Sequence, residues 1–173
     1  ITCLSASKSF NIAGFQSSIV HCTNPELLEK IKTQMHVDNS DSCNVFATTA
    51  VIAAYNDSED WFEELRDVLY ENKQMVKDYL ANELPVVRLV ECDATYLLWL
   101  DCSELNTQSK VLSEFLRQNQ GLFLSAGSDF GECGDNFLRM NIACPPDLLK
   151  DGLARLKAGV IALNNINRLS KNI

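Results

Sequence analysis

The sequence predicts an α/β protein built in two parts, residues 1–84 and residues 85–173. Two observations lead to this prediction. Residues 24–84 carry apolar side chains mostly at helical spacing. After Pro85 the pattern changes to short β-branched and aromatic runs that are typical of strands. Because proline ends a helix, we expect the domain boundary near Pro85, followed by a compact α+β unit.

The first part is expected to begin with two strands. Residues 1–6 are largely apolar, residues 15–21 are mostly β-prone or apolar, and Gly14 supplies a turn between them. The first strand leads directly to Lys8. We expect this strand to be buried, so that it holds the lysine from one side.

Three helices are expected next. Asn24 is a good N-cap and Pro25 suits the first helical position, so the first helix begins there. Asp41 or Ser42 is predicted to cap the second helix, and the third is expected to run from residue 57 to about residue 84. The third helix carries one apolar stripe, made of Trp61, Leu65, Val68, Leu69, Val76, Tyr79 and Leu80.

The second part is expected to mix strands and helices. Residues 86–90 and 94–100 are predicted to be strands joined by a hairpin-like connection. The remaining predicted elements are a helix over 107–118, short strands over 121–124 and 137–143, and a final helix that begins at 145–147.

Composition excludes some classes of function. The net charge of −8 would repel a phosphate backbone, so we expect no nucleic-acid partner. No apolar run reaches the roughly 18 residues of a membrane helix, so we expect no membrane partner. The seven cysteines form no C-x-x-C pair and no Cys/His spacing typical of a metal site. We expect no metal, and we expect free thiols in a reducing cytoplasm.

Lys8 is the first candidate for chemistry. It follows an apolar run and stands among Ser5, Ser7 and Ser9. A partly desolvated lysine can act as a nucleophile, and neighbouring hydroxyls could hold a phosphate. These residues alone fit a surface lysine in a polar turn better.

A later segment changes this interpretation. Residues 127–145 read GSDFGECGDNFLRMNIACP, residues 5–14 read SASKSFNIAG, and residues 94–101 read ATYLLWLD. Together, in this order and spacing, they resemble fold-type I pyridoxal phosphate (PLP) enzymes. More narrowly, they resemble the cystathionine β-lyase or C–S lyase branch of the class I/II aminotransferase superfamily. The resemblance implies that the chain is the C-terminal portion of such an enzyme: the end of the large PLP-binding domain and the small domain.

The resemblance also implies roles for individual residues. Lys8 would bond covalently to PLP and act as the base for the Cα proton. Ser5 matches the family's phosphate-binding serine, and Ser7 is a weaker candidate for the same role. Arg139 matches the arginine that binds the substrate carboxylate. Gln16 stands where many aminotransferases have a phosphate-binding arginine, which argues against a close likeness to aspartate aminotransferase.

The implied activity is β-elimination from cystathionine or a related cysteine S-conjugate, giving pyruvate, ammonia and a thiol. An aminotransferase on the same scaffold is an alternative, because both reactions begin by removing the Cα proton. A non-catalytic interaction or regulatory fragment is a third possibility.

The family also implies a homodimer. In that family, the aspartate that protonates the cofactor ring and the aromatic residue that stacks on it precede the lysine. We therefore expect the 173 residues to need the missing N-terminal half as a partner, and to be inactive alone.

Overall fold

The computed structural model describes the backbone of residues 1–170 and the side chains of residues 1–166. The chain forms two compact units, Ile1–Arg66 and Asp67–Ile173. The division falls inside helix α3 (Glu59–Glu83) and not at the end of that helix. The physical reason is that Val76 and Leu80 of α3 belong to the apolar core of the second unit.

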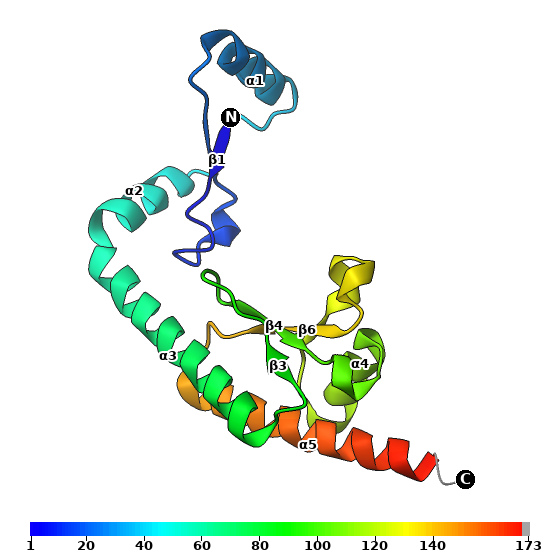
Figure 1. Cartoon of the computed structure of the whole chain (residues 1–173). Coiled ribbons are helices and arrows are strands. Elements are labelled where there is room, and N and C mark those ends of the chain that lie inside the picture. The colour runs from blue at the N-terminus through cyan, green and yellow to red at the C-terminus, as the bar shows by residue number, and fades with distance from the viewer. Residues whose placement is uncertain (171–173) are drawn as a thin grey trace. The chain divides into compact units, whose positions relative to one another are not determined.

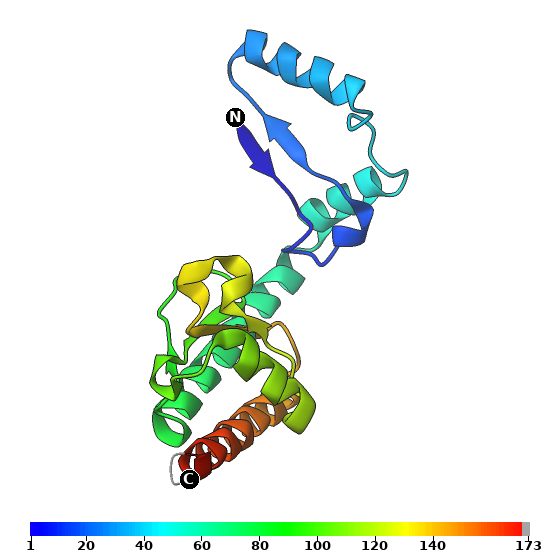
Figure 2. The same ribbon diagram turned by 90° about the vertical axis from the view of Figure 1, so that its right-hand side faces the viewer.

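The first unit begins with a two-stranded antiparallel sheet. Strand β1 (Thr2–Leu4) pairs with β2 (Ile19–His21) (Figure 2). In this pairing Cys3 lies opposite Val20. A short 3₁₀ helix over Ala13–Phe15 replaces the start of the predicted second strand. The prediction of a buried first strand is wrong for this chain: all of β1 is exposed, because β2 is its one partner among the described residues.

Helices complete the first unit. Helix α1 (Pro25–Val37) begins as predicted, and the Asn24 side chain accepts hydrogen bonds from the backbone N–H groups of residues 26 and 27. The predicted caps of the second helix are wrong. Helix α2 (Ala47–Asp57) begins later, where the Asn44 side chain accepts from the N–H of Phe46.

The second unit contains a four-stranded antiparallel sheet with strand order β3-β4-β6-β5. The strand predicted over 121–124 is misplaced, because helix α4 (Ser109–Gln120) ends at Gly121 and the chain pairs as a strand only from Ser125 onward. The elements of this unit besides α3 are β3 (Arg88–Leu89), β4 (Leu97–Asp101), α4 (Ser109–Gln120), β5 (Ser125–Ala126), β6 (Phe137–Asn141) and α5 (Pro146–Ser170), with 3₁₀ turns over Ser103–Leu105, Gly127–Phe130 and Glu132–Gly134 (Figure 1).

The two faces of this sheet differ. Side chains alternate along a strand, so Leu98, Leu100, Leu138 and Met140 share one face and are buried. They pack with apolar residues of α3, α4 and α5 in one hydrophobic core. The other face, which includes Arg139, is only partly covered. Within the described residues, no helix is both long and apolar enough to cross a membrane.

Asn72 of α3 secures the chain just after β6. It is fully buried, and its amide donates to the carbonyl oxygens of Ile142 and Cys144 at 2.9 and 3.0 Å. Asn72→Ala should lower the free energy of unfolding of the full-length protein by about 1–3 kcal/mol, because two buried carbonyls lose their donor. Urea unfolding measures this. The control is Asn119→Ala, which removes an exposed amide on α4 and should change stability by less than about 0.5 kcal/mol. Equal effects would contradict the assigned role of Asn72.

Candidate functional site

The segment after β1 folds into a tight turn around Lys8. The N–H of Phe10 donates to the Ala6 carbonyl at 3.0 Å, and the N–H of Ile12 donates to the Ser7 carbonyl at 3.1 Å. Ala6 is buried, while the Lys8 side chain is exposed. The lysine is therefore presented by an ordered turn and not, as expected, held by a buried strand.

An aromatic cluster anchors this turn. The Phe10 ring lies 5.5 Å from Tyr55, 6.2 Å from Trp61 and 5.4 Å from Phe62, measured between ring centroids. These partners come from the end of α2 and the start of α3. Aromatic pairs at such distances contribute beyond the area they bury, so Phe10 fixes the turn that carries Lys8.

Hydroxyl groups gather just before the lysine. Ser5 Oγ lies 2.7 Å from Ser7 Oγ and 2.9 Å from the Ser17 carbonyl oxygen. A hydroxyl has one proton, so when Ser5 donates to the Ser17 carbonyl it accepts from Ser7. The turn thus brings Ser5 and Ser7 together in the segment that carries Lys8.

Ser17 joins this group, and the sequence reasoning missed it. Its hydroxyl oxygen is buried without a hydrogen-bond partner, while its carbonyl accepts from Ser5. A buried polar group without a partner is unfavourable, so an added acceptor near this hydroxyl would be stabilising. No sequence signal marks Ser17, because the turn that returns the chain to Ser5 is visible only in the structure.

Arg139 lies in the second unit, at the centre of β6. It is directly opposite Trp99 of β4 and Ser125 of β5. Its Nη2 is 3.4 Å from Ser125 Oγ, and its guanidinium carbon is 4.2 Å from the centroid of the Phe130 ring. Among the side chains of residues 1–166, no carboxylate forms an ion pair with Arg139. Most of its N–H donors are therefore available to a bound anion.

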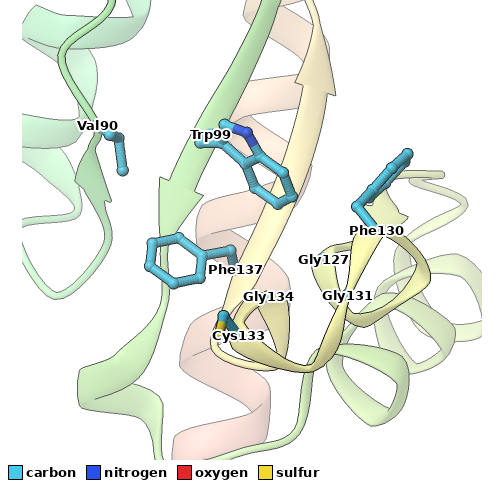
Figure 3. A pocket seen from close by; sticks show the side chains of 8 residues that line it. All are labelled: Val90, Trp99, Gly127, Phe130, Gly131, Cys133, Gly134 and Phe137. Carbon is cyan, nitrogen blue, oxygen red and sulfur yellow. The ribbon is translucent and has the colours of Figure 1, made fainter.

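A cavity of about 320 Å³ opens on the same unit, and Trp99 and Phe130 line it (Figure 3). Its walls are Val90, Trp99, Phe130, Phe137 and Cys133, together with three glycines of the loop that follows β5. None of the lining side chains is charged. The cavity is thus suited to an uncharged group.

Two glycines close the loop over this cavity. A Cβ added to Gly127 would overlap the Gly134 carbonyl oxygen and would lie 2.6 Å from the Phe137 carbonyl oxygen. Gly127→Ala should therefore lower the free energy of unfolding of the full-length protein by about 1–3 kcal/mol. The matched control is Gly152→Ala in α5, where the nearest atom would be 3.8 Å away and alanine favours the helix. Thermal unfolding compares the two, and a Gly127→Ala protein as stable as the control would disprove the close approach.

The cysteines form neither a disulfide nor a metal site within the part of the chain that the structure describes. All seven are free, as predicted, and no group of His, Cys, Asp and Glu side chains in the described part of the chain could hold a metal ion. Burial, with the nearby Asp101 charge, raises the pKa of the Cys102 thiol to about 12. That thiol stays protonated at neutral pH and is a poor nucleophile.

Comparisons with known proteins identify the kind of chain that carries these features. The family model for aminotransferases of class I and II matches residues 1–156. Cystathionine beta-lyase PatB of Bacillus subtilis is 33% identical over 160 residues, which are 92% of this chain and 41% of that protein.

Solved structures agree with this family match. A PLP-bound putative aminotransferase from Clostridium difficile superposes with a TM-score of 0.88 at 31% identity, covering 92% of this chain and 41% of that one. Cystalysin from Treponema denticola, which contains pyridoxal 5′-phosphate, gives a TM-score of 0.89 at 27% identity, covering 94% and 41%. The fold class predicted from the sequence is confirmed. The chain spans about two fifths of the length of the curated relatives that it matches.

Proposed function

The chain belongs to the class I and II aminotransferase family, and we propose that the protein containing it is a PLP-dependent C–S β-lyase. Its substrates would be cystathionine or another cysteine S-conjugate. The observation that carries this proposal is the 33% identity to a cystathionine β-lyase over 92% of the chain. With cystathionine, the overall reaction consumes one water and yields homocysteine, pyruvate and ammonia.

The residues of the Lys8 turn fit the cofactor. The hydroxyls of Ser5 and Ser7 lie within hydrogen-bond distance of each other, and the buried Ser17 hydroxyl has no partner. A phosphate oxygen is an acceptor for such groups, so we assign Ser5 and Ser7 to the phosphate and add Ser17 as a third candidate. Gln16 is uncharged and stands where many aminotransferases have an arginine, so a cation elsewhere must offset part of the phosphate charge.

Bound PLP withdraws electrons from the substrate Cα, which makes the Cα proton acidic. The Nζ of Lys8 would hold the cofactor covalently between turnovers. Once the substrate amine has displaced Lys8 from the cofactor, the freed Lys8 amine would take the Cα proton. As the thiolate leaves from Cβ, its sulfur takes up a proton.

Arg139 would bind the substrate carboxylate. A planar guanidinium can donate two parallel hydrogen bonds to a carboxylate, and Arg139 has no competing ion pair among the described side chains. Fixing the carboxylate orients the Cα–H bond.

The proposal is tested by following the products made by the purified full-length protein. A lyase releases pyruvate and ammonia from cystathionine in the absence of a 2-oxo acid. An aminotransferase, the second candidate favoured by the likeness to the Clostridium difficile protein, needs a 2-oxo acid to accept the amino group. Transfer of the amino group to 2-oxoglutarate without pyruvate release would replace the lyase assignment with an aminotransferase. If the protein catalyses neither reaction, that result would favour a non-catalytic role.

We also propose a homodimer in the cytoplasm. The family resemblance supports the dimer, and seven unpaired cysteines support a reducing compartment. Light scattering of the full-length protein would measure its subunit number.

A further inference from the structure

We propose that Phe130 is a positioning residue that orients the Arg139 guanidinium for the substrate carboxylate. This inference rests on the proposed function, because it assumes that Arg139 binds that carboxylate. It adds a second residue to the site, one that acts through Arg139.

Few contacts restrain the Arg139 side chain. Its hydrogen bond to Ser125 Oγ is 3.4 Å long, which exceeds the usual 2.7–3.2 Å and is therefore weak. The centroid of the Phe130 ring lies 4.2 Å from the guanidinium carbon. This ring restrains the orientation of the guanidinium plane more than the weak hydrogen bond to Ser125 does. Without that ring, a long and flexible side chain would sample several orientations.

The contact between the Phe130 ring and the Arg139 guanidinium suits a carboxylate site. An aromatic ring contacts the face of a guanidinium, whereas a carboxylate accepts hydrogen bonds from its edge, in the plane. Phe130 can therefore hold Arg139 without using the N–H donors that a carboxylate needs. An acidic partner would fix the same side chain only by competing with the substrate.

The Phe130 ring is itself held in place. It contacts Trp99 edge to face, with centroids 5.7 Å apart, and Trp99 contacts Phe137 in the same way at 5.8 Å (Figure 3). The backbone that carries it is tied to α4, because Ser109 Oγ lies 3.0 Å from Ser128 Oγ and accepts from the N–H of Ser128. Gly127 and Gly134 close the same loop. Phe130 is therefore presented by an ordered loop, although half of its surface is exposed.

The experiment measures KM and kcat for a cysteine S-conjugate with the full-length protein. Phe130→Leu should raise KM by about 3- to 30-fold, which corresponds to the range of cation–π energies, with kcat changed less than about twofold. Phe130→Tyr keeps the ring and should stay within about twofold of the wild type. The matched control is Phe123→Leu, which removes another ring that lies 5.8 Å from an arginine, Arg117 of α4. It should leave both constants unchanged.

A double-mutant cycle separates positioning from a general structural effect. In an Arg139→Gln background, Phe130→Leu should raise KM by less than about twofold, because the ring has no guanidinium to orient. The same rise in both backgrounds, or an unchanged KM in Phe130→Leu, would overturn the inference. An unchanged KM in Arg139→Gln alone would instead refute the proposed role of Arg139. If Phe130→Leu does not fold, Phe130→Met, whose flexible unbranched side chain fills irregular gaps, takes its place in the same measurements.

Discussion

Replacing Lys8 with alanine in the full-length protein is expected to lower kcat for cysteine S-conjugates by at least about 10²- to 10⁴-fold. That range is the usual contribution of a positioned general base, and the loss of the covalent bond to the cofactor adds to it. No other lysine lies in the turn formed by residues 5–17, so no neighbour there can take over the role.

The chemical test is direct. Borohydride makes the lysine–cofactor bond permanent, and peptide mapping then locates the pyridoxyl group, which we expect on Lys8. The control is Lys32→Ala, an exposed lysine of α1 that forms an ion pair with Glu29 and should keep full activity. A pyridoxyl group on a different lysine would remove Lys8 from the site.

Replacing Arg139 is expected to have the second large effect. Arg139→Ala should reduce kcat/KM for amino-acid substrates by roughly 30- to 1000-fold, since losing a charge-assisted bidentate pair amounts to about 2–4 kcal/mol. Arg139→Lys should also weaken the substrate strongly, because an ammonium group does not reproduce the planar fork of donors. Cofactor binding should change little in either variant.

The matched control for Arg139 is Arg117→Ala. Arg117 also lies near a phenylalanine ring, but it is exposed on α4. Steady-state kinetics of both variants, with the cofactor absorbance recorded beforehand, distinguishes loss of substrate binding from loss of PLP. An Arg139→Ala enzyme with wild-type kcat/KM would show that another group binds the carboxylate.

Local signals predicted the elements that depend on local chemistry. Asn24 followed by Pro25 marked the start of α1 correctly, because a cap acts within one helical turn. The second helix was misjudged: Asp41 and Ser42 are good caps by residue type, but the helix begins after Phe46, and no side chain caps it. The division between the units was expected near Pro85 but falls inside α3, because a continuous helix can pack its two halves in different units.

The candidate site also contains some residues that the sequence marked and others that only the structure revealed. Ser5, Ser7 and Lys8 are close in sequence, but by themselves they fit a surface lysine better. Only the resemblance of several segments to one family marked them, and their roles stay predictions. Arg139 could be singled out only by its resemblance to a family motif, because nothing in its immediate neighbours distinguishes it from a surface arginine. Ser17 carried no signal of either kind, and Phe130 lies within the matching segment 127–145 but was given no role there.

The sequence by itself determined the family, the α/β class and the order of most elements, and it predicted which residues are most suited to chemistry. These properties follow from local patterns and from motifs that are contiguous in the chain. Only the tertiary structure decided that β1 is exposed, that the Ser17 carbonyl accepts from Ser5, and that the Phe130 ring lies on Arg139. The reason is physical: each of these depends on strand pairing and loop closure, which bring together groups that no local spacing relates.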